Sequence, residues 1–455
     1  MNELRFLALN GLMHGNGFPE SSLEAGLEAD PAFIGIDAGS TDGGPYYLGA
    51  GENMHQSRAA AKEVLRTLIT HARAADIPLL VGSAATGGGR VHLDWTVELV
   101  REIATEEALE FTVGAIDAEQ SASTITQAID EGRLEALDGS KPLTRADVES
   151  SERIVAVMGP EPYTEALDRG ADVVIAGRSS DVSIFKALPV EMGFDEGLAT
   201  HLAKTIECGG QIATPSTGGD CMLGVLTDEY FRVTPTNPEK TTSPLSVASH
   251  MLYESADPFV FVEPRGTLHT DDCSYQAVDD RTVEVRGSRF EPAAEYTLKL
   301  EGARLVGYRA ITVLGIRDPV LVHRQLDAFL DRTTAAVAKK AKTQGIQEYT
   351  ISTHVYGRDA VMGAREPDPT PSHEVGVVVD VVAPTADTAK GLVHHAGNYL
   401  LHADYPNRTS TAGNVAFPLS PQDAAIDRAY EFSVWHRMSV EDPLERFDIS
   451  TEVVG

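Results

Sequence analysis

Short apolar runs alternate with amphipathic stretches through the first half of the chain, and this alternation constrains the fold most strongly. Such runs are typical of strands buried on both faces, and the stretches between them have helical periodicity. Strands that alternate with helices build βαβ units and therefore a parallel sheet. The expected strands are residues 4–9, 33–36, 78–81, 111–116, 153–158 and 172–176, and the expected helices are 56–74, 93–106, 121–131, 162–169 and 198–208.

The character of the sequence changes near residue 233. Pro and Thr are frequent over 233–244, where they disfavour both a helix and a central strand. We therefore expect a Rossmann-like α/β domain over 1–232, a mixed α+β segment over 233–345 that completes the main domain, and a small α+β domain over 346–455. The elements expected after the change are strands at 259–262, 281–285, 296–300 and 310–314, a helix at 319–343, strands at 349–356 and 374–382, a helix at 386–401 and a strand at 430–436.

The charge balance excludes several classes of partner. The 455 residues include 37 Lys and Arg against 68 Asp and Glu, a net charge of −31. A surface this negative repels phosphate backbones and anionic lipid headgroups, so we expect neither a nucleic-acid nor a membrane partner. The acidic excess is either an ordinary solvated surface or an adaptation to high salt, where counterions screen the repulsion.

Cysteine and histidine usage bears on compartment and cofactors. The three cysteines, Cys208, Cys221 and Cys273, are too few and too widely spaced for a disulfide framework, and the N-terminal segment lacks the pattern of a signal peptide. We therefore expect a cytoplasmic protein. No histidine spacing matches a metal-binding motif, so we predict no cofactor, and a divalent metal would need ligands from distant segments.

The first candidate site is the polar loop over residues 37–51, which follows an expected strand. Asp37, Ser40, Asp42, Tyr46 and Tyr47 place carboxylates, a hydroxyl and phenols together there. Carboxylates and phenols can act as general base and general acid, and catalytic residues concentrate on loops held by a rigid scaffold. The alternative is a tight turn whose aspartates bond their own backbone.

The second candidate is a glycine-rich loop between the strand at 78–81 and the helix at 93–106. Such a turn into a helix can present backbone N–H groups to an anion. It lacks the lysine of a Walker loop and the middle glycine of a dinucleotide fingerprint, so a carboxylate or another phosphate is the simpler ligand. A flexible connection is the alternative. The candidate residues are Gly82, Ser83, Thr86, Gly87, Gly88 and Arg90.

The third candidate is the segment Arg178-Ser179-Ser180-Asp181, which follows the strand at 172–176. The planar fork of Arg178 suits a substrate carboxylate, and Ser179 and Asp181 lie beside it. Asp181 could hold that fork or simply cap the following helix. Because all three loops follow strands at one edge of one sheet, we expect them to converge.

Several longer motifs resemble the acyclic terpene utilisation (AtuA) family over residues 6 to about 320, and the last hundred residues resemble the small ferredoxin-like domain that accompanies it. The resemblance implies a catabolic protein of the cytoplasm whose substrates are small or CoA-linked carboxylic acids. It assigns no catalytic residue. The motifs are GFPE at 17–20, DAGSTD at 37–42, GPYYLG at 44–49, HLDWT at 92–96, MGPEP at 158–162, AGRSSD at 176–181, ECG at 207–209 and SPLSVA at 243–248.

Three functions are compatible with these residues. The first is a hydro-lyase that hydrates or dehydrates a hydroxycarboxylate, with Asp37 or Asp42 as base and Tyr46 or Tyr47 assisting departure of the hydroxyl. The second is a hydrolase or transferase with Ser40 or Ser83 as nucleophile, which needs a histidine within reach. The third is a non-catalytic ligand-binding subunit. Strand edges in the mixed segment also predict a homo-oligomer.

Overall fold

The computed structural model describes residues 3–11, 17–54, 57–216, 219–368, 370, 372–408 and 410–455. The chain forms two compact units. Unit 1 comprises Met1–Arg304 and Phe432–Gly455, and unit 2 comprises Leu305–Glu431. The predicted boundaries at 232/233 and 345/346 differ from this division, because two long strands, β15 (Tyr296–Ile316) and β18 (Asp423–Val440), each contribute residues to both units.

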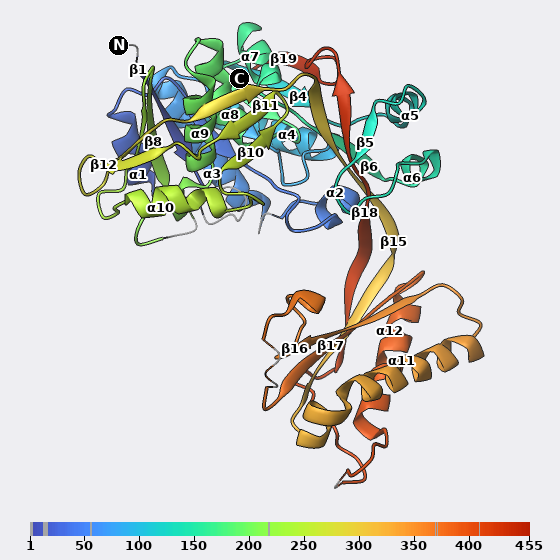
Figure 1. Cartoon of the computed structure of the whole chain (residues 1–455). Coiled ribbons are helices and arrows are strands. Elements are labelled where there is room, and N and C mark those ends of the chain that lie inside the picture. Colours follow the sequence, from blue (N-terminus) through green and yellow to red (C-terminus); the bar gives the residue numbers. More distant parts are fainter. Residues whose placement is uncertain are drawn as a thin grey trace. The chain divides into compact units, whose positions relative to one another are not determined.

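Unit 1 is built on a ten-stranded mixed sheet (Figure 1). Its middle is parallel, in the order β1 (Glu3–Leu9), β2 (Ile34–Asp37), β3 (Leu79–Gly82), β7 (Val173–Ala176) and β4 (Phe111–Asp117). Next to β1 the sheet continues with antiparallel strands β8 (Cys221–Thr227), β9 (Phe231–Pro235), β13 (Val283–Arg286) and β12 (Ser274–Ala277). At the other edge β19 (Asp448–Val454) pairs antiparallel with β4. The α/β class predicted from the alternation is confirmed, in a sheet of mixed direction.

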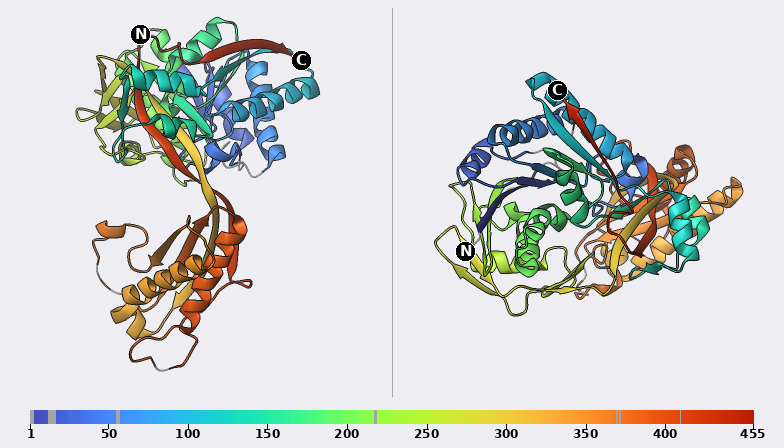
Figure 2. Two further views of the ribbon diagram at one scale, coloured as in Figure 1. Left: turned by 90° about the vertical axis from the view of Figure 1, so that its right-hand side faces the viewer. Right: turned by 90° about the horizontal axis from the view of Figure 1, so that it is seen from above.

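Helices cover both faces of this sheet, as the right-hand view of Figure 2 shows. Alternate residues of a strand point to opposite faces, so Leu7 and Leu9 of β1 pack with α3 (Arg58–Ala75) and α4 (Arg90–Glu107). Phe6 and Ala8 pack instead with α7 (Glu161–Asp168), α8 (Asp181–Glu191) and α9 (Glu196–Ile206). The remaining helices of unit 1 are α1 (Glu20–Leu27), α2 (Tyr46–Ala50), α5 (Ala122–Asp130), α6 (Arg145–Glu149) and α10 (Pro244–Ser249).

One predicted strand of the parallel sheet lies elsewhere. The run at 153–158 forms β6 (Arg153–Val157), which pairs antiparallel with residues 299–303 of β15. Its apolar side chains are buried among elements whose pairing the alternation pattern does not predict. The smaller strands of unit 1 are β5 (Leu134–Ala136), β10 (Val260–Glu263), β11 (Gly266–His269) and β14 (Arg289–Pro292), and the last three form a separate antiparallel sheet.

Unit 2 packs two helices on a small antiparallel sheet. β16 (Thr350–Tyr356), β17 (Val375–Ala383) and the second half of β15 are antiparallel neighbours, and β18 adjoins β15. The helices α11 (Leu326–Thr343) and α12 (Ala386–His402) lie side by side against this sheet (Figure 1). Every second residue of β17 from Val375 to Val381 is buried in the shared apolar core. None of the helices in the described part of the chain has the length and apolar character to cross a membrane.

Candidate functional site

Two adjoining cavities open in unit 1 beyond the carboxyl ends of the parallel strands. Their volumes are about 390 Å³ and about 240 Å³. They share the side chains of Asp42, Asp181 and Glu254, which therefore form the wall between them. Asp37 ends β2 and Asp181 follows β7, so the cavities lie where open α/β sheets place their ligands.

The aspartates of the first predicted loop reach these cavities, whereas its tyrosines do not. Asp37 and Ser40 line the smaller cavity, and Asp42 lines both. The buried Oδ1 of Asp37 has no hydrogen-bond partner among the described residues. Tyr46 and Tyr47 belong to α2, line neither cavity, and the Tyr46 hydroxyl donates to Glu52 at 3.1 Å. We therefore place the aspartates in the site and leave the phenols out of it.

The glycine-rich loop is a buried part of the scaffold. Residues 82–89 are all buried, and none of them lines either cavity. The N–H groups of Ser83, Ala84, Thr86, Gly87 and Gly88 donate to backbone oxygens of the protein, so they are not presented to an anion. The next two N–H groups donate to the side chains of His92 and Glu119. The side chain of Arg90 pairs with Asp117.

This loop packs so closely because glycine is placed where no side chain fits. A Cβ on Gly88 would lie 2.4 Å from the backbone nitrogen of Arg178, and one on Gly39 would lie 2.3 Å from the carbonyl oxygens of Ser83 and Thr86. Gly88 also has a φ of +63°, which favours glycine. The loop predicted to bind an anion therefore makes close contacts with the Asp37 loop and with Arg178. These contacts fix the two relative to each other.

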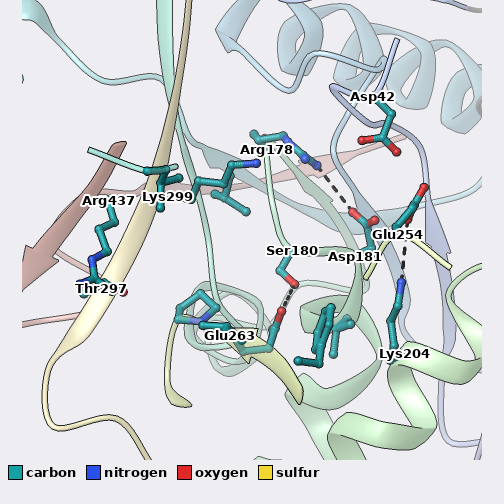
Figure 3. A pocket seen from close by; sticks show the side chains of 16 residues that line it. Asp42, Arg178, Ser180, Asp181, Lys204, Glu254, Glu263, Thr297, Lys299 and Arg437 are labelled. Atoms are coloured by element: carbon teal, nitrogen blue, oxygen red, sulfur yellow. Dashed lines mark hydrogen bonds and ion pairs between the residues drawn. The ribbon is translucent and has the colours of Figure 1, made fainter. Parts of the chain in front are cut away.

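Arg178 lies at the larger cavity, but most of its guanidinium is held by the protein. Its Nε donates to Glu301 Oε2 at 3.0 Å, and its Nη1 donates to Ser83 Oγ at 3.1 Å and to the Ser179 carbonyl at 3.0 Å. Asp181 lies 3.6 Å from the same Nη1 (Figure 3). Ser179 is fully buried and does not line the cavity. The fork predicted for a substrate carboxylate is thus largely occupied.

Glu301 is the partner that the sequence did not reveal. Its side chain is fully buried in β15. Burial would raise its pKa, but Arg178 and Lys299 outweigh that effect and lower the pKa to about 2. Glu301 is therefore a permanent anion that anchors Arg178. Arg178→Lys should therefore lower the thermal midpoint, because Lys cannot reproduce these bonds.

Two carboxyls of the shared wall, those of Asp181 and Glu254, have raised pKa values. Burial, which Arg178 opposes and Glu207 reinforces, raises the pKa of Asp181 to about 7. Burial and a hydrogen bond with Asp42 raise the pKa of Glu254 to about 7. Burial and the charge of Asp181 also raise the pKa of Asp37. Near neutral pH Asp181 and Glu254 can both release and accept a proton.

Positive charge at the wall comes from Lys204, a residue that no sequence motif singled out. Lys204 of α9 donates to Glu207 Oε1 at 2.7 Å and lies 3.8 Å from Glu254 Oε2 (Figure 3). Its side chain is 4% exposed. Lys204 thus compensates part of the negative charge while facing the larger cavity.

Nucleophile and metal chemistry gain less support from the geometry. Ser83 is fully buried, and Ser40 Oγ accepts the backbone N–H of Asp42. Neither serine has a histidine among its hydrogen-bond partners in the described residues. In the same part of the chain, one group of side chains offers three ligand atoms within 4.8 Å of one another, namely Glu20, Glu24 and His71, which line neither cavity.

The fold and the site define a class of protein. It is an α/β protein in which carboxyl groups that titrate near neutral pH line a cavity at the carboxyl ends of the parallel strands. The chain belongs to the family described as "Acyclic terpene utilisation family protein AtuA", whose model matches residues 58–226 and 231–419. The family resemblance in the sequence motifs is thereby confirmed. Neither the curated proteins nor the solved structures include a match to this chain.

Proposed function

We propose that this protein is a hydro-lyase that adds water to, or removes water from, a small or CoA-linked carboxylic acid. The observation that carries the proposal is the wall shared by the two cavities, where Asp181 and Glu254 have pKa values of about 7. Dehydration needs a base for the proton next to the carboxylate and an acid for the departing hydroxyl. Groups that hold or release a proton at neutral pH suit both tasks.

The cavity is also suited to the acid itself. Its polar wall faces apolar side chains, among them Val182 and Phe261, which can cover a short carbon chain. Lys204 and Lys299 supply positive charge for the carboxylate, in addition to Arg178. A volume of about 390 Å³ takes a small acid or the acyl end of a larger thioester.

Two alternatives have weaker support. A hydrolase or transferase that uses Ser40 or Ser83 lacks a histidine hydrogen-bonded to either hydroxyl in the described residues. A non-catalytic ligand-binding subunit does not need carboxyl groups with raised pKa values. Burial makes such groups costly to keep ionised, so their presence favours a catalytic role. We retain a cytoplasmic location and a homo-oligomer as proposals.

The finer fold assignments are part of this proposal. A Rossmann-like first domain is supported by the parallel order β1-β2-β3-β7-β4 with helices on both faces. A ferredoxin-like second domain is supported by the element order of unit 2, β15-α11-β16-β17-α12-β18, which follows the β-α-β-β-α-β pattern.

The test is a panel of hydroxy and unsaturated carboxylates and their CoA thioesters, incubated with the protein and followed by mass spectrometry for gain or loss of water. We expect one acid in the panel to change by one water, and Asp181→Asn or Glu254→Gln to slow that change at least about 100-fold. Glu98→Gln, on the exposed face of α4, is the matched control. Failure of every acid in the panel would refute the proposal.

A further inference from the structure

Ser180 stands at the start of α8, yet its hydroxyl does not cap that helix. In six other helices the side chain before the first helical residue accepts an N–H of the first turn; these residues are Ser57, Ser121, Thr144, Asp195, Ser243 and Thr385. Ser180 has the extended backbone of a cap residue but makes no such bond. Its Oγ instead donates to Oε1 of Glu263 at 2.8 Å (Figure 3).

Glu263 lies at the end of β10 and is 6% exposed. Its Oε2 accepts no hydrogen bond from the described residues and lies 3.6 Å from Nζ of Lys186. A buried carboxylate normally gathers several donors. With one hydroxyl donor and one ammonium beyond hydrogen-bond distance, Glu263 keeps an oxygen that can accept a further hydrogen bond.

Lys186 is fully buried on α8, and its Nζ has no hydrogen-bond partner in the described part of the chain. Two other buried lysines, Lys204 and Lys240, approach their carboxylate partners at 2.7 Å and 2.5 Å. The pair with Glu263 is looser, and it leaves Oε2 of that carboxylate without a hydrogen-bond donor among the described residues. Burying such an ion pair gives little or no stability, so stability alone does not account for it.

From this arrangement we propose that Ser180 is a catalytic residue that passes a proton between the substrate's hydroxyl group, or a water, and Glu263. Ser180 and Glu263 both line the larger cavity, as does Asp181, the next residue in the chain. Because Oγ donates to Glu263, its lone pairs are left to accept a proton from the cavity. Lys186 is a positioning residue that acts through Glu263.

The proposed step is balanced in both directions and rests on the hydro-lyase function. In hydration, an O–H bond of water breaks as a bond from that proton to Ser180 Oγ forms, and the original Oγ–H proton moves to Glu263 Oε1. The oxygen of the water then adds to the double bond, and a protonated wall carboxyl, Asp181 or Glu254, supplies the proton to the neighbouring carbon. In dehydration, Glu263 returns its proton through Ser180 to the departing hydroxyl, which leaves as water, while a wall carboxylate takes the proton from carbon.

The two proton transfers can be separated by experiment. With the substrate found in the panel, loss of water is followed by mass, and exchange of the proton next to the carboxylate is followed by NMR in deuterated water. We expect Ser180→Ala to lose water at least about 100-fold more slowly than the wild type while it still exchanges that proton. Ser180→Thr, which keeps a hydroxyl, should recover part of the rate, and Asp181→Asn should lose both reactions.

Control variants distinguish the proposed role of Ser180 from a folding defect and from a failure of the hydro-lyase function. Ser121→Ala removes a helix cap hydroxyl on α5 and should change neither reaction. Lys186→Met should slow water loss and have no further effect in Glu263→Gln, and it should keep the exchange of the proton next to the carboxylate, which a general structural defect would impair. A Ser180→Ala protein that loses water at the wild-type rate, or loses proton exchange as well, would overturn the role of Ser180 alone. A wild type that never gains or loses water would overturn the hydro-lyase function.

Discussion

Asp181 should make unit 1 less stable as the pH rises, and replacing it with Asn should remove that dependence. The folded state raises the pKa of this carboxyl from an ordinary 3.8 to about 7. Folded protein therefore holds a proton on Asp181 at pH values where the unfolded chain has released it, which favours the folded state. This stabilisation is complete below pH 4 and is lost as the pH rises through 7.

The magnitude of this loss of stability follows from the pH range over which Asp181 is protonated in the folded state and ionised in the unfolded state. Between pH 5 and pH 8 the loss spans about two pKa units, and at 1.36 kcal/mol per unit it is at most about 3 kcal/mol. Because Asp181 shares its environment with Asp37 and Glu254, we expect about 1 to 3 kcal/mol. Asn cannot release a proton, so the free energy of unfolding of Asp181→Asn should fall by that much less over the same range.

The assay is urea unfolding at pH 5 and pH 8, followed by tryptophan fluorescence. Both tryptophans, Trp95 and Trp435, lie in unit 1, so the signal reports on the unit that contains the site. Asp168→Asn, at the exposed end of α7, is the control and should behave as the wild type. An equal fall in Asp181→Asn and the wild type would show that the carboxyl titrates normally and would refute the argument.

Three further measurements test other features. Glu301→Gln should lower the free energy of unfolding by about 3 to 5 kcal/mol in urea titrations, because Arg178 would stay buried without its anion; an unchanged midpoint would show that the pair is dispensable. Gly88→Ala should cost about 2 kcal/mol or more, since its methyl group would meet the Arg178 backbone, and wild-type stability in this variant would contradict the close contact. If the acidic surface is an adaptation to high salt, the thermal midpoint should rise between about 0.1 M and about 2 M KCl, and a flat response would refute that reading.

The strand positions of the parallel sheet could be predicted because each strand is short, apolar and bounded by polar turns. Residues 111–116 correspond to β4, and 172–176 to β7. Strand pairing was harder to predict from the sequence, because β6 pairs with β15, which lies far along the chain. The sequence analysis predicted two strands, 296–300 and 310–314, where the structure has the single strand β15, which includes the charged Glu301. Its charge is buried because Arg178 and Lys299 neutralise it.

The sequence predicted some of the residues that line the cavities, namely those that cluster in the sequence. Asp37, Ser40, Asp42 and Asp181 follow strands of one sheet, and the structure brings them to the cavities. The remaining groups come from segments without a motif. Glu254, Glu263 and Lys204 are isolated charges in the sequence, and only their shared burial beside the aspartates makes them part of the site. Burial of a charge depends on packing between distant segments, which local patterns do not record.

The edge strand β19 has a consequence for biosynthesis. It covers β4 of the parallel sheet, but the whole of unit 2 precedes it in the chain. During translation, therefore, residues 305–431 emerge and can fold while one edge of the larger sheet still lacks its partner. An uncovered strand edge invites pairing with other chains, and parallel sheets form slowly. The time taken to synthesise unit 2 is thus a period in which the nascent protein is exposed to aggregation and would benefit from a chaperone.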